Sequence, residues 1–431
     1  MSLFLGPMRH HIPGKKELTE SVPLMELQPK KEVYIPLVAG ANTDFEIFVQ
    51  EGDAVKVGTK LACTKAGFCV PIYSSVSGTY KGIVKRMHNS LRPQNHMVIE
   101  CDGKQEKIQA FKPLDYKSAS REECVEFVKN AGIVGLGGAG FPAYVKYSKP
   151  EGIDCVLINA VECEPYITAD YRAVMEDCSS LITGCKIMKK MANTDKVYIC
   201  IKKSHPDLIE KVQSELHDAQ GIEVKPVPDV YPMGWERVLV REVLHKEYNA
   251  LPAEAGAIVG NASTAIAIAH AFEDGDAIYE KCLTVSGEGV KKPTNVKVCV
   301  GMPVSEIIEA CGGYTSENVR LIAGGPMMGK TIVNDMFVVD RAMNAITVLP
   351  DKPVDAIACL RCGRCSDHCP SGLQPVRISQ ALKANDVDEM AKRGASSCIE
   401  CGLCTYICPS KIDVTENVRK AKRIVAMKKK K

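Results

Sequence analysis

Residues 359–369 read CLRCGRCSDHC and residues 398–408 read CIECGLCTYIC, and a proline follows each run. Both runs space their cysteines C-x2-C-x2-C-x3-C. Three closely spaced thiolates can converge on one face of a [4Fe–4S] cluster, while the fourth, next to the proline that ends the run, reaches the other cluster. The spacing therefore predicts crossed ligation. One cluster is held by Cys359, Cys362, Cys365 and Cys408, and the other by Cys398, Cys401, Cys404 and Cys369.

Two zinc knuckles or structural disulfides are the alternatives for these eight cysteines. Zinc sites rarely use four cysteines this close together with a trailing proline. The runs also repeat at a constant offset of 39 residues, from Cys359 to Cys398, which is typical of a two-cluster ferredoxin fold. We therefore expect residues 351–431 to form a ferredoxin domain with two [4Fe–4S] clusters and a basic tail.

Length, cysteine content and charge indicate the number of domains, the cellular compartment and the kinds of partner. A chain of 431 residues holds about three domains or more. Twelve of its 20 cysteines are scattered outside the two runs, which favours a reducing cytoplasm. The net charge of +3 is too small to indicate a nucleic-acid partner. The basic end, RKAKRIVAMKKKK over 419–431, either rests on anionic lipid or an acidic partner, or is simply solvated.

Membrane insertion is not indicated by any apolar run of 18 residues. The nearest candidate is AIVGNASTAIAIAHAF, residues 257–272, which contains Asn261, Thr264 and His270. These polar residues favour a buried helix over a membrane span. We expect a cytoplasmic protein that is soluble or, at most, peripheral on the cytoplasmic face of the membrane.

Residues 1–117 have the pattern of a small β module. Short alternating runs, FEIFVQEGDAVKVGTKLA (45–62) and PIYSSVSGTYKGIV (71–84), are broken by turn residues. They resemble the barrel-sandwich fold of biotinyl and lipoyl domains, but Lys65 does not stand where those domains carry their modified lysine. We therefore expect a structural module without a swinging arm. Cys63 and Cys69 are close enough for a thiol pair, although unpaired buried cysteines are the preferred interpretation.

Residues 118–277 alternate helical and strand patterns, which predicts a parallel sheet with flanking helices. Ligands of such sheets bind beyond the carboxyl ends of the strands. Ser120 is a plausible N-cap for the first helix. Helices are predicted over 120–132, 169–192 and 205–219, and buried strands over 155–161 and 196–201. Residues 278–350 then read strand, strand, helix, strand, which suggests a β-grasp module.

A glycine-rich loop precedes the first buried strand. Gly135, Gly137 and Gly140 satisfy G-x-G-x-x-G, a weak signal by itself, and Gly138 adds a fourth glycine. Pro142 is expected to begin a helix, so that the free amides of the loop hold a phosphate at the helix N-terminus. Lys146 follows one turn later and can add a positive charge.

Polar residues also end the strand CVLINAV, residues 155–161. The polar residues at and just after its carboxyl end are Asn159, Glu162 and Glu164. Two carboxylates this close together are costly to bury unless they bind something, such as ribose hydroxyls or a flavin edge. The alternative is an exposed acidic loop beside a glycine turn.

Several motifs in this order resemble the RnfC family. They are GLGGAGFPAYVK, INAVECEPYITADYRAVME, YPMGWERVLVREV, GNASTA, TVSGEGVKKPTNVKVCVG, IAGGPMMG and the doubled cysteine run. This family supplies the NADH-oxidising subunit of the Rnf ferredoxin:NAD oxidoreductase. The resemblance implies an α/β multidomain protein: a barrel-sandwich module (1–117), an FMN- and NADH-binding α/β domain (118–277), a soluble-ligand-binding β-grasp (SLBB) domain (278–350) and the ferredoxin domain (351–431).

The resemblance also implies roles for individual residues. The four glycines would cradle FMN or dinucleotide phosphates, Phe141 would flank the adenine, and Lys146 would contact the flavin phosphate. Strand-end, acidic and loop residues would surround flavin and nicotinamide: Asn159, Glu162, Glu164, Glu236, Asn261 and Thr264. Three features depart from related proteins: Leu136 where the complex I subunit has arginine, the bulky Trp235, and the loop AGANTDF (39–45) without a glutamine–histidine segment.

The implied function is hydride exchange between NAD(H) and FMN, followed by relay of single electrons through two [4Fe–4S] clusters to or from partner redox subunits, with ferredoxin as a further partner. No catalytic acid or base is required. Two alternatives stay open: a soluble RnfC-like subunit that feeds a reductase of the proline, cobalamin or folate type, and a non-catalytic carrier in which only the clusters work.

Overall fold

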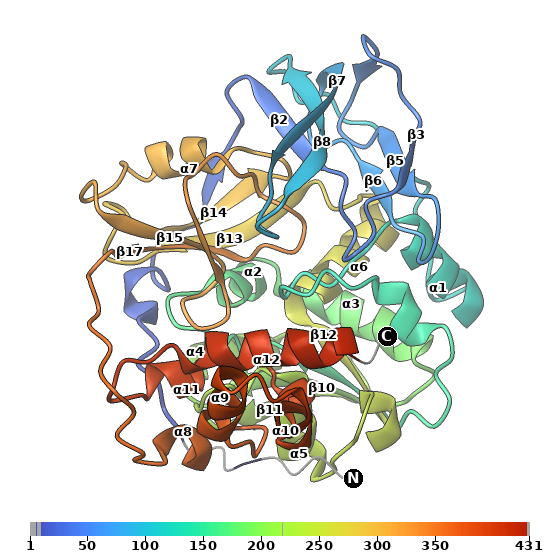
Figure 1. The fold of residues 1–431 in the computed structure, drawn as a ribbon. Helices are drawn as coiled ribbons and strands as arrows, with labels where there is room; N and C mark the ends of the chain where they lie inside the picture. The colour runs from blue at the N-terminus through green and yellow to red at the C-terminus, as the bar shows by residue number, and fades with distance from the viewer. Residues whose placement is uncertain (1–5, 7–9, 218, 429–431) are drawn as a thin grey trace.

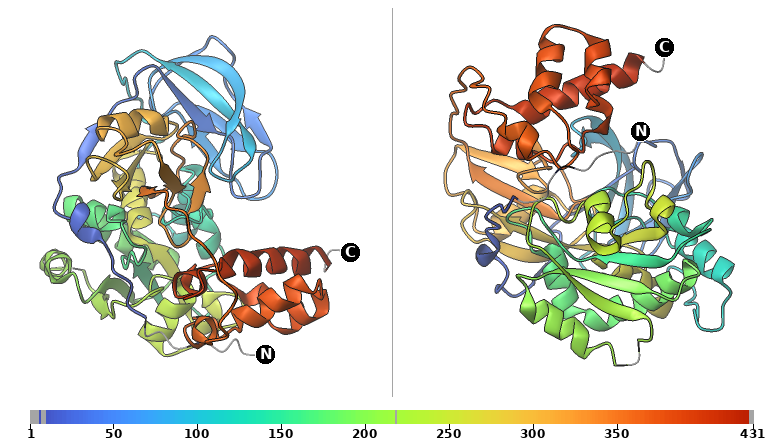
Figure 2. Two further views of the ribbon diagram at one scale, coloured as in Figure 1. Left: turned by 60° about the vertical axis from the view of Figure 1, so that its left-hand side comes forward. Right: turned by 90° about the horizontal axis from the view of Figure 1, so that it is seen from below.

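The computed structural model describes residues 6, 10–217 and 219–428, and it arranges them as four modules (Figure 1). The barrel module lies at the top of Figure 1 and the C-terminal helices at the bottom. Seen from below, those helices project from the front face of the molecule (Figure 2). None of the described helices is long and apolar enough to cross a membrane.

The first module is the expected β module. Its core is formed by side chains of both sheets, among them Val33, Leu61 and Ile99. Cys63 and Cys69 are unpaired, as expected, but half-buried rather than buried. One sheet has the order β2-β8-β7-β4 (Glu32–Pro36, Pro93–Cys101, Gly78–Met87, Ala54–Val55), and the other β3-β5-β6 (Phe45–Ile47, Lys60–Thr64, Pro71–Tyr73).

The second module contains the expected parallel sheet, in the order β11-β10-β9-β12. Alternate residues of β9 enter two cores: Val156 and Ile158 face one helical layer, while Leu157 faces the other. The strand is therefore buried on both faces, as predicted. The strands are β9 Cys155–Asn159, β10 Val197–Lys202, β11 Ile222–Val227 and β12 Ala257–Asn261.

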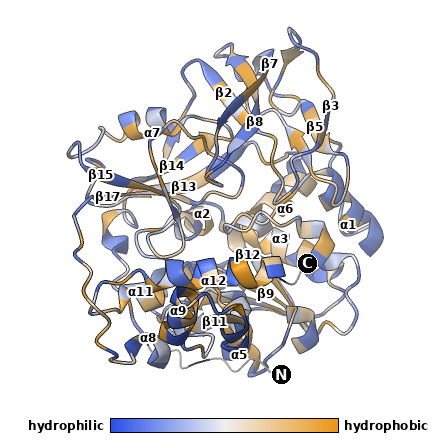
Figure 3. Cartoon of the chain, in the orientation of Figure 1, coloured by the Kyte–Doolittle hydropathy of each residue, from blue (hydrophilic) through white to orange (hydrophobic). Residues whose placement is uncertain are grey.

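The helices of this module begin where local signals place them. Ser120 caps α1 in a reciprocal capping box with Glu123, as its position predicts. In Figure 3 α1 shows a polar outer face, as expected for a helix that packs on one side only. The helices are α1 Arg121–Asn130, α2 Ala169–Glu176, α3 Cys178–Met191, α4 Pro206–Ser214, α5 Glu236–Leu244, α6 Ala262–Asp274, and the 3-10 turns η2 Ala143–Tyr147 and η3 Pro252–Ala255.

Two predicted helices were wrong in extent. The helix expected over 169–192 is two helices, because Asp177 leaves helical geometry and its carboxylate caps α3 at the amide of Ser180. The buried helix expected over 257–272 is instead strand β12 followed by α6, with Asn261 as the N-cap between them. In both stretches a short polar side chain satisfies free amides at a helix start, which apolar periodicity does not reveal.

The third module is built on a six-stranded sheet, in the order β1-β14-β13-β17-β15-β16. Its first strand comes from the N-terminal segment: β1 pairs in parallel with β14, placing Met25 opposite Val296. The same segment carries the turn η1 Lys16–Leu18. The elements are β1 Met25–Leu27, β13 Glu280–Ser286, β14 Thr294–Cys299, α7 Val304–Ala310, β15 Val319–Ala323, β16 Lys330–Ile332 and β17 Ala345–Pro350.

The fourth module is helical and packs its own small core, including Ile378, Met390 and Val418. Residues 351–363 lead into it as exposed irregular chain. Its elements are α8 Arg364–Asp367, α9 Pro375–Lys383, α10 Val387–Lys392, η4 Ala395–Ser397, α11 Leu403–Tyr406 and α12 Val414–Lys428.

Arg341 ties three modules together from the segment between β16 and β17. Its guanidinium donates to the carbonyl of Pro71 in the barrel module (3.1 Å) and to that of Gly132 in the parallel-sheet module (3.4 Å). Burial lowers the pKa of Arg341 to about 10, and the neighbouring Asp340 carboxylate opposes that shift. The side chain is therefore an enclosed cation that depends on these partners.

We predict that Arg341→Met lowers the free energy of unfolding by about 3 kcal/mol, because the change leaves the buried carbonyls of Pro71 and Gly132 without their charged donor. Arg320→Met is the control, because Arg320 forms an exposed ion pair with Asp351 and its loss changes stability by about 0.5 kcal/mol or less. Thermal unfolding of both variants checks this. Equal losses in the two variants would contradict the interpretation.

Candidate functional site

A cavity of about 860 Å³ opens where the first three modules meet. Every nucleotide- or flavin-site residue expected from the sequence lines it, together with Trp235. The set comprises Gly135, Gly137, Gly138, Gly140, Phe141, Lys146, Asn159, Glu162, Glu164, Glu236, Asn261 and Thr264.

The glycine loop forms a closed turn on one wall of the cavity. The amide of Gly135 donates to the carbonyl of Phe141 (2.8 Å) and the amide of Gly140 to the carbonyl of Gly135 (3.2 Å). Gly138 and Gly140 have φ of 115° and 62°, which favour glycine. The amides at 137–139 donate to none of the described residues, so they remain available to an anion.

The expected helix after Pro142 is only a five-residue 3-10 turn, η2. The loop amides, rather than a helix N-terminus, therefore form the anion-binding feature. Lys146 lies at the end of this turn, where its ammonium donates to the carbonyl of Val259 (2.7 Å) and lies 3.5 Å from the Glu236 carboxylate. Lys146 and Glu236 thus meet beside Val259, in the middle of β12.

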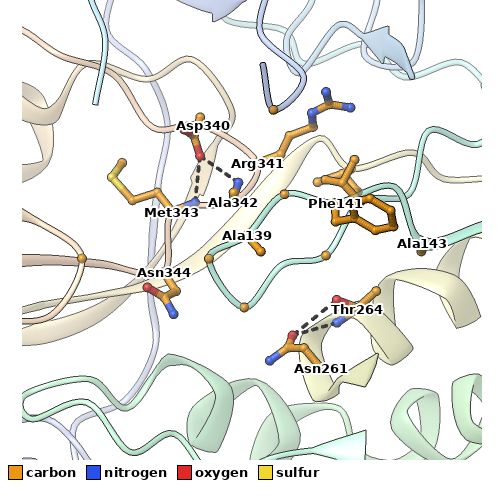
Figure 4. Close-up of a pocket in the computed structure, with 18 of the residues that line it drawn as sticks. Ala139, Phe141, Ala143, Asn261, Thr264, Asp340, Arg341, Ala342, Met343 and Asn344 are labelled. Carbon is orange, nitrogen blue, oxygen red and sulfur yellow. Dashed lines mark hydrogen bonds between the residues drawn. The ribbon is translucent and has the colours of Figure 1, made fainter. Parts of the chain in front are cut away.

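Asn261 and Thr264 fasten the glycine loop to α6. Oδ1 of Asn261 accepts from the amide of Thr264 (3.2 Å), and Oγ1 of Thr264 accepts from the amide of Leu136 (2.9 Å). A Cβ on Gly137 would lie 3.0 Å from Nδ2 of Asn261, so a larger residue there would require the Asn261 side chain to shift. Figure 4 shows Ala139 and Phe141 between this pair and the loop 340–344.

Asp170 orients Asn261 and was missed by the sequence analysis. Its carboxylate accepts from Nδ2 of Asn261 (2.6 Å) and from Oγ of Ser263 (2.5 Å). This fixes which way the Asn261 amide faces. Asp170 does stand inside the quoted motif INAVECEPYITAD, but a carboxylate in the first turn of a helix also reads as an ordinary capping residue.

The loop 340–344 was also missed. Oδ1 of Asp340 accepts from the amides of Ala342 (2.7 Å) and Met343 (2.8 Å), which shapes the loop into a turn over the cavity (Figure 4). Its other oxygen lies 3.5 Å from Nε2 of His88 in the barrel module. The contact with His88 was not predictable from the sequence, because the two residues are remote in the chain.

Glu162 is held inside the protein and not in an exposed acidic loop. Its carboxylate accepts from the amides of Asp170 (2.8 Å) and Tyr171 (3.3 Å), at the start of α2. Lys16 lies beneath this loop and donates to the carbonyls of Glu162 and Glu164 (2.9 Å each) and of Ile167. Desolvation raises the pKa of Glu162, while the Lys16 charge opposes the rise.

Glu164 joins the parallel-sheet module to the loop GGPMMG of the third module. Its carboxylate accepts from the amides of Met327 (3.1 Å) and Met328 (2.7 Å). Burial raises its pKa to about 7. Asn159, at the end of β9, donates from Nδ2 to the carbonyl of Gly234 (2.7 Å) and so supports the segment that carries Trp235.

One set of cysteines in the C-terminal module combines residues of both runs. Cys398, Cys401 and Cys404 line one small cavity together with Cys369 from the other run. The amide of Glu400 donates to the sulfur of Cys398 (3.3 Å), a hydrogen bond that would stabilise a thiolate ligand. Among the described residues no group of three or more His, Cys, Asp or Glu side chains is placed to hold a single metal ion.

The second set of cysteines is more open. Cys359 and Cys362 are exposed. The amides of Ile357 and Leu360 donate to Ser410, two residues after Cys408, so the segment that carries Cys359 lies beside the end of the second run. The donor set of four thiols in each group fits a [4Fe–4S] cluster.

Tyr231 connects the large cavity to the inner set of cysteines. Its hydroxyl donates to the carbonyl of Cys401 (2.6 Å), and its ring is buried with Ile12 and Leu403. Cys163, which lines the large cavity, packs against the same cluster. A continuous buried contact therefore runs from the cavity to Cys401, which is 8% exposed.

We predict that stability depends on pH through Glu164. Because its folded pKa is raised above the ordinary value of 4.5, the folded state binds the proton more tightly, and the contribution to stability falls as pH rises from about 4.5 to about 7. The fall is on the order of 3 kcal/mol. Between pH 5 and pH 8, the melting temperature of the wild type should therefore fall further than that of Glu164→Gln. The exposed Glu46→Gln should follow the wild type, and an identical drop in all three proteins would contradict the prediction.

Comparison with known proteins places the four modules in known families. Residues 10–104 match the RnfC barrel sandwich hybrid domain, residues 128–270 the Nuo51 FMN-binding domain, residues 283–331 the SLBB domain and residues 352–409 a 4Fe-4S dicluster domain. These matches confirm the predicted fold class, including the β-grasp and ferredoxin modules.

Whole-length relatives agree with these matches. The chain is 34% identical, over 97% of both chains, to a subunit of the Na⁺-translocating ferredoxin:NAD⁺ oxidoreductase complex of Acetobacterium woodii. It is 33% identical to the equivalent subunit of the proton-translocating complex of Clostridium ljungdahlii, over 89% of this chain and 85% of the relative. It is also 33% identical to the equivalent subunit of an ion-translocating oxidoreductase complex of Rhodobacter capsulatus, over 89% and 76%.

Among solved structures, an NAD⁺-reducing [NiFe]-hydrogenase in the H₂-reduced state shares the fold, with a TM-score of 0.51 and 16% identity over 72% of this chain and 63% of that chain. The order of the four matched domains and the near-complete alignment with the Acetobacterium sequence agree on one assignment. The chain belongs to the RnfC family of electron-transfer oxidoreductase subunits, with an FMN-binding domain and a dicluster [4Fe–4S] domain.

Proposed function

We propose that the chain exchanges a hydride between NAD(H) and FMN in the large cavity, and relays single electrons through two [4Fe–4S] clusters to or from partner redox subunits. The observation that carries this proposal is the buried contact from the cavity through Tyr231 to Cys401. When bound, FMN supplies the change from two-electron to one-electron chemistry. A non-catalytic carrier would need neither the cavity nor this contact.

The residues of the cavity have distinct tasks. The free amides at 137–139 and the Lys146 ammonium bind phosphate. Phe141 supplies an apolar face for an adenine ring. Asn261, Asp170 and Glu162 keep the loop and the start of α2 in place through the hydrogen bonds described above.

The two sets of cysteines differ in solvent exposure, and from this we infer the order in which electrons pass through the two clusters. Cys398, Cys401, Cys404 and Cys369 hold the inner cluster, next to the cavity. Cys359, Cys362, Cys365 and Cys408 hold the outer cluster, whose first two ligands are exposed. Partner subunits reach the outer cluster, and the relatives' names point to ferredoxin as a further electron carrier. We place the protein in the cytoplasm, at most peripheral to the membrane.

The direct test of this function is anaerobic absorbance spectroscopy of the purified protein. Flavin and iron–sulfur bands are expected, and NADH should bleach the flavin band. Lys146→Met should weaken FMN binding about tenfold through loss of a charge-assisted contact, while the exposed Lys149→Met should retain it. Intact clusters without any flavin would overturn the proposal in favour of a cluster-only carrier.

The order of the clusters can be tested by electron paramagnetic resonance. Each of Cys401→Ser and Cys359→Ser should lower the iron content by about four atoms. In Cys359→Ser the remaining inner cluster should still be reduced by NADH. In Cys401→Ser the flavin should bleach while the outer cluster stays oxidised. Cys163→Ser is the control for iron content, since Cys163 lies on the same contact outside both sets. Reduction of the outer cluster by NADH in Cys401→Ser would contradict the proposed order of the clusters.

A further inference from the structure

Two thiols outside the cysteine runs face each other in the barrel module. Cys63 is the fourth residue of β5, and Cys69 lies two residues before β6. Their sulfur atoms are 3.4 Å apart, and both residues are half-buried. A disulfide needs sulfur atoms about 2.05 Å apart, so roughly 1.3 Å of approach separates this pair from a bond. Both lie on one short hairpin, where a small movement of the Cys69 segment toward Cys63 can supply that approach.

The loop between these thiols rests on the rim of the large cavity. The Phe68 ring lies 5.5 Å from the ring of Phe141, edge to face, and both rings are exposed. The amide of Cys69 donates to the hydroxyl of Tyr144 in η2 (3.1 Å). Phe141 and the turn η2 therefore contact the segment that carries Cys69. A displacement of Cys69 toward Cys63 moves Phe68 relative to Phe141.

We propose that Cys63 and Cys69 are a redox modification site, which forms a reversible disulfide and thereby weakens dinucleotide binding at Phe141. The oxidant is a low-molecular-weight disulfide, RSSR. One thiolate attacks RSSR and releases RS⁻, and the second thiolate then attacks the mixed disulfide and releases the other RS⁻. In sum, two thiols and RSSR give one intramolecular disulfide and two RSH, so two electrons and two protons pass to RSSR.

Access to solvent distinguishes the pair from the deeply buried cysteines of the chain. Cys185 and Cys200 are fully buried, where a disulfide reagent has no access. Burial and the hydrogen bond with Cys63 raise the pKa of Cys69. The thiolate fraction at neutral pH is therefore small, and exchange accelerates as pH rises. The link to dinucleotide binding rests on the function proposed above, whereas disulfide formation does not.

The test treats anaerobic holoprotein with glutathione disulfide and then alkylates the remaining thiols. Mass spectrometry should find the tryptic peptides 61–65 and 66–81 joined through Cys63 and Cys69, and a dithiol reductant should separate them. Cys101 is also half-buried and should be recovered alkylated. Cys63→Ser should abolish the joined peptide. Recovery of Cys63 and Cys69 as free thiols at every ratio of disulfide to thiol would overturn the proposal.

A second experiment tests whether the disulfide weakens dinucleotide binding. Its probe is ADP-ribose, because this ligand carries the adenine half of the dinucleotide without redox chemistry. Calorimetry should show severalfold weaker ADP-ribose binding to the oxidised protein, restored on reduction and absent in Cys63→Ser. Phe68→Ala should weaken binding without oxidation, while Phe48→Ala, an equally exposed ring of the same module, should not. A disulfide that leaves ADP-ribose binding unchanged would refute the link. Failure of NADH to bleach the flavin in reduced protein refutes the proposed function instead, and leaves the disulfide result standing.

Discussion

Three enclosed cations, each from a different part of the chain, hold the loops around the large cavity. Lys16 of the N-terminal segment, Lys281 of β13 and Arg341 before β17 all donate to backbone carbonyls of the parallel-sheet module. Taking a cation out of water costs several kcal/mol, and burial lowers the pKa of all three. Carboxylates offset that cost: Glu162 for Lys16, Asp170 for Lys281 and Asp340 for Arg341.

The geometry of the cavity follows from these cations. The carbonyls they bind belong to the loops that form its wall: residues 162–167 for Lys16, Leu136 for Lys281 and Gly132 for Arg341. The amides at 137–139, in the same loop as Leu136, donate to none of the described residues and so stay available to a ligand. Glu162 and Glu164, which the sequence suggested as ligands, line the site and also have structural roles. Glu162 offsets the charge of Lys16, and both carboxylates accept hydrogen bonds from backbone amides of neighbouring segments. These hydrogen bonds and the Lys16 charge explain why two carboxylates separated by a single residue can both be removed from water here.

Local signals in the sequence were sufficient wherever neighbours in the chain decide the structure. Ser120 with Glu123 predicted the start of α1, and the uninterrupted apolar run 155–161 predicted a strand buried on both faces. Eight of the twelve cavity residues were predicted from the glycine-rich loop, Lys146 and the strand end. The other four, Phe141, Glu236, Asn261 and Thr264, were predicted through family resemblance, and the cavity brings all twelve together. What the sequence missed depends on partners far away in the chain. Lys16 meets Ile167 and Arg341 meets Pro71 across 151 and 270 positions, and nothing near either residue marks it as different from a surface cation.

The same reasoning explains why the two cysteine runs, identical in spacing, take unequal positions. Spacing sets how each group of thiols converges, but burial depends on which run meets another module. The second run packs against Tyr231 and Met327, and Gly402 allows that approach because a Cβ there would lie 2.5 Å from the carbonyl oxygen of Met327. The first run follows exposed chain, with Leu360 61% exposed. The first run has a glycine at the same place, Gly363, so the glycine alone does not separate the two runs. Exposed outer thiols and enclosed inner ones follow from the packing of the second run against another module, which the repeated motif does not encode.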